Sequence, residues 1–264
     1  MKSNILIGNK NIFYTDIGEG KVIVLLHGYL ESLEIWDDFS TQLSKKYRVI
    51  SFDIPGHGDS DVIAENQSMK MISEILYQTL GVLGITKCFL IGHSMGGYVT
   101  LMMHKLNPEL LSGFCLFHSH PFADTQETKK KRLREIELVK DGRKDLIARF
   151  NLPSAYADEN IKSLKKAVNR SIEIALKTSK EGAIANLYAM TNRPNFSREL
   201  SNSEIPFLYL LGKHDNLMDC TDIIKNVTLP KTSELYILEN SGHMGFIEEK
   251  EKSLKIITQF INKY

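Results

Sequence analysis

The chain has 264 residues, of which 42% are hydrophobic and 25% charged, and its mean hydropathy is −0.19. These values are typical of a globular protein and argue against a disordered chain or a bundle of membrane-spanning helices. Thirty-three basic and 32 acidic side chains give a net charge of +1, so no overall field would attract nucleic acid or an anionic membrane surface.

The three cysteines, Cys88, Cys115 and Cys220, are scattered and form no Cys-x-x-Cys pair. Such spacing predicts no disulfide framework and favours a reducing compartment. The first residues contain no apolar run long enough for a secretory signal, so we expect a cytoplasmic protein without membrane contacts. The sequence does not determine the oligomeric state, so both a monomer and a homodimer are compatible with it.

Outside residues 121–193, the chain is expected to form an α/β sheet. An opening hairpin is expected before residue 22, and short runs of branched apolar residues then alternate with amphipathic stretches. Continuous apolar runs of this kind are typical of a mostly parallel sheet that is covered by helices on both faces. The predicted strands are Val22 to Leu26, Arg48 to Phe52, Cys88 to Ile91, Gly113 to Phe117, Pro206 to Leu211 and Glu234 to Leu238.

Between residues 121 and 193 the strand pattern stops and helical spacing replaces it. This predicts a helical cap inserted after the sixth strand, with a core domain made of residues 1–120 and 194–264. The expected apolar face of the cap comprises Ile136, Val139, Leu146, Ile147 and Phe150.

One basic run, Lys129-Lys130-Lys131-Arg132, lies inside the predicted cap. Acidic residues follow it within a helical pattern, which predicts a solvated helix face without a function of its own. The cap otherwise looks mainly apolar, with no cluster suited to a charged substrate.

The segment Gly92-His93-Ser94-Met95-Gly96 matches G-x-S-x-G directly after a predicted strand and before a predicted helix. In that context glycines allow a sharp turn and a closely packed helix, so that the serine hydroxyl stands exposed above the sheet. The alternative is a glycine-rich turn with an incidental serine. The flanking strand and helix favour Ser94 as a nucleophile.

A serine hydroxyl needs a general base, and the base needs an orienting acid. His243 follows the last predicted strand, which is where this base is expected. Asp215 follows the strand 206–211 and completes the chain order serine, acid, histidine. Asp219 and Asp222 lie close enough in the sequence to be alternatives to Asp215.

The turn His27-Gly28-Tyr29 follows an earlier strand, where a backbone N–H can face a developing oxyanion. The predicted oxyanion hole therefore consists of the N–H groups of Tyr29 and Met95. His27 is expected to hold this loop. Asp53 precedes Ser94 in the chain, so it is assigned to a turn.

These motifs together resemble the α/β-hydrolase superfamily, within it the capped branch of carboxylesterases, enol-lactonases, perhydrolases and carbon–carbon bond hydrolases. The resemblance covers nearly the whole chain apart from the cap. It rests on His27-Gly28, Asp53-x-Pro-Gly-His-Gly-x-Ser60, Gly92-His93-Ser94-Met95-Gly96-Gly97, Gly212-x-x-Asp215 and Gly242-His243.

The resemblance implies attack by Ser94, an acyl-enzyme, and hydrolysis of that intermediate by water that His243 activates. It implies no metal and no organic cofactor. Serine at position 94 argues against the haloalkane dehalogenase and epoxide hydrolase branches, which place an aspartate there.

Substrate contacts are assigned by position alone, to Tyr29, His118, Phe122, Leu217 and Met244. His118 and His120 flank a strand end, where they either touch substrate or satisfy backbone groups. As a metal site this pair lacks a third ligand.

The leading hypothesis is a serine hydrolase that cleaves a small or medium carboxylic ester. A lactonase or a carbon–carbon bond hydrolase would use the same triad and would have a tight, polar pocket. A ligand-binding, receptor-like module with little turnover is the alternative from another class.

Overall fold

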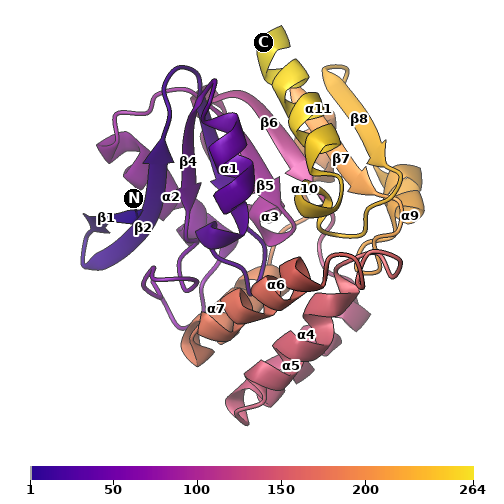
Figure 1. Ribbon diagram of the computed structural model, residues 1–264. Helices are drawn as coiled ribbons and strands as arrows, with labels where there is room; N and C mark the ends of the chain where they lie inside the picture. Colours follow the sequence, from indigo (N-terminus) through magenta and orange to yellow (C-terminus); the bar gives the residue numbers. More distant parts are fainter. Residues whose placement is uncertain (1) are drawn as a thin grey trace.

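The computed structural model describes residues 2–264 and contains, within them, one sheet of eight strands (Figure 1). The strand order is β1-β2-β4-β3-β5-β6-β7-β8, with β1, β2 and β4 pairing antiparallel and all later neighbours parallel. The predicted mostly parallel sheet is thereby confirmed. The strands are β1 (Lys2–Ile7), β2 (Lys10–Ile17), β3 (Val22–Leu26), β4 (Arg48–Phe52), β5 (Cys88–His93), β6 (Leu111–Phe117), β7 (Phe207–Gly212) and β8 (Ser233–Leu238).

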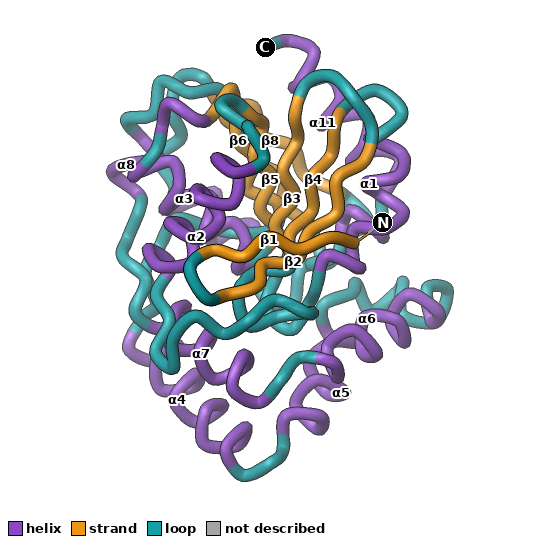
Figure 2. The backbone as a smooth tube through the Cα atoms, turned by 90° about the vertical axis from the view of Figure 1, so that its left-hand side faces the viewer, coloured by secondary structure: helices purple, strands orange, loops and turns teal. Residues whose placement is uncertain are grey.

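Helices cover both faces of the sheet because its central strands are apolar on both sides. Along β3, Val24 and Leu26 belong to the core under α2 and α3, whereas Ile23 and Leu25 belong to the core under α1 and α11. Figure 2 shows these two helix pairs on opposite sides of the sheet. The helices outside the insertion are η1 (Leu33–Trp36), α1 (Asp37–Leu43), α2 (Met69–Val82), α3 (Met95–Leu106), η2 (Pro108–Leu110), α8 (Ser197–Ser201), α9 (Cys220–Asn226), α10 (Gly245–Glu248) and α11 (Lys250–Lys263).

Four helices lie between β6 and β7, all within residues 121–193. They are α4 (Gln126–Lys140), α5 (Lys144–Ser154), α6 (Lys165–Lys177) and α7 (Lys180–Thr191). Figure 1 shows them gathered at the end of the sheet toward which the parallel strands point. Their expected apolar face is only partly buried, because Leu146 and Phe150 are 65% and 81% exposed.

The predicted reactive residues lie at the carboxyl ends of the parallel strands, on the same edge of the sheet as the inserted helices. Ser94 follows β5, Asp215 follows β7, His243 follows β8, and His27 follows β3. Since β3, β5, β6, β7 and β8 are consecutive neighbours in the sheet, their carboxyl ends form one continuous edge. The insertion therefore covers the edge that carries these residues.

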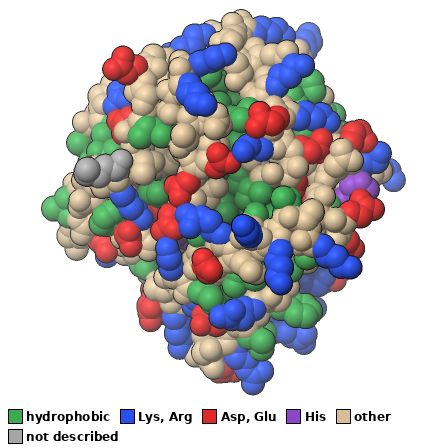
Figure 3. Space-filling view, viewed as in Figure 1, with side chains coloured by type: hydrophobic (Ala, Val, Ile, Leu, Met, Phe, Trp, Pro, Cys, Tyr) green, Lys and Arg blue, Asp and Glu red, His purple; other side chains and the backbone are tan. Residues whose placement is uncertain are grey.

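On the face seen in Figure 3, basic and acidic side chains are interspersed, in keeping with the net charge of +1. No helix within residues 2–264 is both long enough and apolar enough to cross a membrane.

Candidate active site

Ser94 occupies a strained turn between β5 and α3. Its backbone angles are φ 50° and ψ −114°, outside the regions that a residue with a Cβ normally adopts. The flanking glycines let the helix pack directly on the sheet. A Cβ at Gly92 would lie 2.4 Å from the oxygen of Gly96, and a Cβ at Gly96 would lie 2.4 Å from the oxygen of Leu26. This close packing holds the Ser94 side chain above the edge of the sheet.

His243 and Asp215 are joined by a hydrogen bond of 2.7 Å between Nδ1 and Oδ2. The other carboxylate oxygen of Asp215 accepts the N–H groups of Leu217 and Met218, each at 2.9 Å. Because Nδ1 of the imidazole donates to the carboxylate, Nε2 of His243 is left to accept a proton.

The two groups shift one another's pKa. Burial acts to lower the pKa of His243, but the charge and hydrogen bond of Asp215 outweigh it and raise that pKa above its ordinary value. Burial acts to raise the pKa of Asp215, but His243 and His118 outweigh it and hold that pKa far below its usual range. Asp215 is therefore a carboxylate at neutral pH.

The neighbouring acids have other partners. Asp219 is the N-cap of α9 and accepts the N–H groups of Thr221 and Asp222. Asp222 accepts a hydrogen bond of 2.9 Å from the amide of Asn226. Of the three candidate acids, Asp215 is the one that contacts His243.

The predicted oxyanion loop is held by polar contacts of its own. His27 donates from Nδ1 to the oxygen of Gly28 at 2.7 Å and accepts the N–H of Ile54 at Nε2 at 3.0 Å. Both ring nitrogens of His27 are thus used within the loop. Among residues 2–264, the N–H groups of Tyr29 and Met95 donate no hydrogen bond to another protein group. These two donors are therefore available to an oxyanion.

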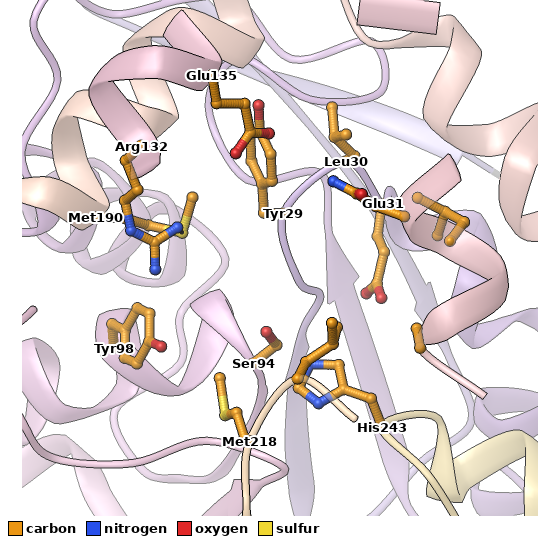
Figure 4. Close-up of a pocket in the computed structure, with 14 residues that line it drawn as sticks. Tyr29, Leu30, Glu31, Ser94, Tyr98, Arg132, Glu135, Met190, Met218 and His243 are labelled. Carbon is orange, nitrogen blue, oxygen red and sulfur yellow. Dashed lines mark hydrogen bonds between the residues drawn. The ribbon is translucent and has the colours of Figure 1, made fainter. Parts of the chain in front are cut away.

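A cavity of about 330 Å³ lies between this edge and the insertion (Figure 4). Ser94 and His243 both line it, so the hydroxyl and the imidazole face the same space. The other lining residues are Tyr29, Leu30, Glu31, Tyr98, Arg132, Glu135, Asn151, Leu152, Ala155, Met190, Leu217 and Met218.

The family model described as alpha/beta hydrolase fold matches residues 21–250. The chain belongs to this family. It is 26% identical over 244 residues to a 2-succinyl-6-hydroxy-2,4-cyclohexadiene-1-carboxylate synthase from Enterobacter sp. (strain 638), covering 90% of this chain and 91% of the relative.

A 3-oxoadipate enol-lactonase from Acinetobacter baylyi is 25% identical over 232 residues, covering 86% of this alpha/beta hydrolase and 83% of the relative. A solved thermophilic esterase from Thermogutta terrifontis superposes with a TM-score of 0.94 at 24% identity, covering 100% of this chain and 98% of its own. That likeness shows the fold. Relatives of this alpha/beta hydrolase thus include hydrolases of several kinds.

Of the residues assigned to substrate by position, only some line the cavity. Tyr29 and Leu217 line the cavity, whereas His118, Phe122 and Met244 lie outside its described lining. Met244 is fully buried in the core under α1 and α11. Phe122 stacks on His120 at 5.4 Å and donates its N–H to that ring. Position at a strand end did not distinguish the side chains that line this cavity from those that do not.

His118 lies behind the acid. Its Nε2 accepts the N–H of Gly245 at 3.1 Å, so Nδ1 carries the proton and lies 3.6 Å from Oδ2 of Asp215. Burial lowers the pKa of His118 to about 4, which keeps the ring neutral near pH 7. His118 therefore adds a second imidazole beside the Asp215 carboxylate.

The ligand atoms of His118, Asp215 and His243 all lie within 4.8 Å of one another, which is also the spacing of a metal site. A tetrahedral zinc ion with bonds of about 2.1 Å would hold its ligand atoms about 3.4 Å apart. The 2.7 Å between His243 Nδ1 and Asp215 Oδ2 is shorter than that separation. A shared proton fits this geometry better than a metal ion.

The basic run at residues 129–132 does not form one solvated face as predicted. Four consecutive residues span more than one turn of α4, so one of them must face inward. Arg132 lies one turn before buried Ile136 and lines the cavity with Glu135, and only 19% of its side chain is exposed. The expectation of no charged cluster in the cap is wrong for the same reason.

Glu31 and His93 form a buried hydrogen-bonded pair beside His243, which the sequence did not reveal. His93 donates from Nδ1 to Glu31 Oε2 at 3.0 Å and from Nε2 to the backbone oxygen of His243 at 2.9 Å. The same Glu31 oxygen accepts the N–H of Gly28 at 2.6 Å. This network links the oxyanion loop, the residue before Ser94 and the loop of His243.

Replacing Glu31 by glutamine is expected to lower the free energy of unfolding by about 3 kcal/mol at pH 7, because it removes the buried carboxylate that accepts hydrogen bonds from His93 and Gly28. Burial acts to raise the pKa of Glu31, but His93 outweighs it and lowers the pKa, so this stabilisation is lost as pH falls through that value. Urea unfolding at pH 7 and pH 3 measures both. Glu34→Gln, which breaks a surface pair with Lys177, should cost under about 1 kcal/mol. Equal losses for the two variants would contradict the expectation.

Proposed function

We propose that this alpha/beta hydrolase is a serine hydrolase that cleaves small or medium carboxylic esters through an acyl-enzyme on Ser94. The observation that carries the proposal is the shared cavity of Ser94 and His243, with the Asp215 carboxylate 2.7 Å from His243 Nδ1. A serine on a strained turn, a base with a free Nε2 and a buried acid are the parts that acyl transfer requires.

In the first half-reaction His243 Nε2 takes the proton of Ser94 while Oγ attacks the ester carbonyl carbon. The resulting oxyanion accepts hydrogen bonds from the N–H groups of Tyr29 and Met95, and the start of α3 adds its dipole. His243 then protonates the departing alcohol. In the second half-reaction water gives a proton to His243 and attacks the acyl carbon. The bond from the acyl carbon to Ser94 Oγ then breaks, His243 returns the proton to Oγ, and the acid is released.

The cavity supports a small substrate. Its volume of about 330 Å³ lies near the lower end of ligand pockets, which run from about 300 to 1,000 Å³. A cap formed by α4 to α7 would exclude bulkier acyl groups in this arrangement.

The experiment is a stopped-flow assay with p-nitrophenyl acetate and butyrate, combined with intact-mass measurement after acid quench. We expect a burst of p-nitrophenol and a mass increase equal to one acyl group, mapped to Ser94 by peptide digestion. Turnover without an adduct, or an adduct elsewhere, would overturn the mechanism. Failure of a fluorophosphonate to label Ser94, while a small molecule still raises the melting temperature, would instead favour the receptor-like alternative.

A lactone is the second candidate substrate, and the charged cavity wall favours it. Arg132 and Glu135 line the cavity opposite Ser94, which matches the polar pocket expected for a lactonase. The relative from Acinetobacter baylyi is an enol-lactonase. Parallel assays of alkyl esters and five- or six-membered lactones would rank the two by kcat/KM.

Activity should fall on the acid side of neutrality. Only neutral His243 accepts a proton, and its pKa is raised above 6.5 by Asp215. We therefore expect kcat/KM to rise with pH through an apparent pKa above 6.5 and then to level off. A pH–rate profile from pH 5 to 9 checks this, and an inflection below pH 6 would contradict it.

A further inference from the structure

One side chain places a positive charge on the cavity wall. Arg132 extends from α4 into the cavity, and Figure 4 shows it on the opposite side of Ser94 from His243. A buried guanidinium stays charged, so its environment must supply an anion or strong acceptors.

The carboxylate in direct contact with Arg132 is shared with a second guanidinium group. Asp124 accepts from Arg132 Nε at 2.6 Å and from Arg193 Nη1 at 2.5 Å, so two guanidinium groups share one carboxylate. The Arg193 side chain is 1% exposed, also donates to the oxygens of Phe122 and Met190, and stacks over Tyr98 at 3.9 Å. Arg193 is therefore satisfied internally, and the unmatched charge resides on Arg132.

The outer nitrogens of Arg132 lack a good acceptor. Nη1 lies 3.4 Å from the sulfur of Met190, which is a weak acceptor, and within residues 2–264 no hydrogen bond is formed by Nη2. Glu135 lines the same cavity but forms no ion pair within the described chain, so its carboxyl group acts on Arg132 only at a distance. The two outer guanidinium nitrogens of Arg132 therefore have no strong acceptor from the described residues and are available to a ligand in the cavity.

A second unused polar group lies on the same wall. The hydroxyl of Tyr29 is buried and, among the described residues, makes no close hydrogen bond, although the carboxyl group of Glu135 lies near enough to interact with it. Figure 4 shows it beside Glu135, on the same side of the cavity as Arg132. An unpaired buried hydroxyl is costly, so a ligand group that accepts from it would be favoured.

We propose that Arg132 binds a carboxylate on the substrate, at the end remote from the bond that Ser94 attacks. The proposal rests on the function proposed above and narrows it to half-esters of short dicarboxylic acids and lactones with a free carboxylate. A guanidinium fork suits a carboxylate because its two outer N–H groups match the two oxygens. The Tyr29 hydroxyl is a further donor for the acyl chain or its carboxylate.

The test compares two esters with the same five-carbon acyl chain, monoethyl glutarate and ethyl pentanoate, followed by pH-stat titration. We expect wild-type kcat/KM to be at least about tenfold higher for the half-ester, since charged hydrogen bonds have this order of effect. Arg132→Gln should lower the half-ester value about 10- to 100-fold and change the neutral-ester value less than threefold. The kcat/KM of Arg132→Lys for the half-ester should lie between the values of the wild type and Arg132→Gln.

Arg134→Gln is the matched control, because Arg134 lies on the same helix with an exposed side chain. This substitution should leave kcat/KM for both esters unchanged. Equal loss on both esters in Arg132→Gln would overturn the proposal, because it would mean that Arg132 acts only through its bond to Asp124. No loss on the half-ester would overturn it as well.

Binding of glutarate separates this inference from the proposed function. We expect millimolar glutarate to raise the melting temperature of the wild type and of Arg134→Gln but not of Arg132→Gln. If neither ester is hydrolysed and Ser94 acquires no acyl group, the hydrolase proposal fails, while a glutarate shift lost in Arg132→Gln still supports the carboxylate site. No shift in the wild type would overturn it.

Discussion

Replacing His243 by alanine is expected to lower kcat for ester hydrolysis by about a million-fold, the loss typical when the base of a serine triad is removed. Among residues 2–264, no other side chain that lines the cavity near Ser94 carries an imidazole. The remaining rate should come from the oxyanion donors and from binding. Steady-state assays with high enzyme concentration measure the residual rate.

The matched control is His214→Ala, because His214 lies in the loop after β7 and its side chain is exposed. It should retain nearly full activity. Melting temperatures of both variants would verify folding. A His243→Ala enzyme that kept more than about one hundredth of wild-type kcat would place the general base elsewhere.

Asp215→Asn is expected to lower kcat about ten-thousand-fold while the protein stays folded. Leu217 and Met218 both donate N–H groups to Oδ1, so they would hold the amide oxygen of asparagine at that position. The amide nitrogen would then face His243 Nδ1 and donate to it. That contact favours the imidazole tautomer with hydrogen on Nε2, which cannot take the proton of Ser94.

Asp219→Asn separates the two candidate acids. Asparagine is as good an N-cap as aspartate, so α9 should stay intact and turnover should change only a few-fold. The pH profile of residual Asp215→Asn activity gives an independent measure, because loss of the carboxylate should lower the pKa of His243. Near-normal turnover in Asp215→Asn would mean that another residue is the acid that orients His243. A large loss in Asp219→Asn would contradict the assignment of Asp215 as well.

The sheet and the acid–base pair could be predicted because their signals are local in the sequence. An apolar run that ends at glycine or aspartate predicts a strand exit, and parallel pairing brings such exits to one edge. The spacing Gly92-x-Ser94-x-Gly96 predicts a sharp turn by itself. These inferences need no knowledge of distant packing. They led to Ser94, Asp215 and His243.

The remaining cavity residues depend on packing between distant segments. Glu31 meets His93 across 62 positions of the chain, and no local pattern announces that contact. His118 ends a strand as expected, but its φ of 47° and its bond to Gly245 turn the ring behind Asp215. Arg132 had a usable signal, since it lies four residues before Ile136 on a helix, and a helical wheel would have placed it on the inner face.

Ser94 and His243 are held by loops of the sheet, whereas Arg132 and Glu135 belong to the helices between β6 and β7. In the proposed enzyme, the stretch of chain that selects the substrate is therefore distinct from the stretches that carry out the reaction. Mutations in α4 could change the accepted molecule while the reacting groups keep their positions. Because the two sets of residues lie on separate stretches of chain, related genes would be able to acquire new substrate specificities through changes in the inserted helices while the catalytic residues stay the same.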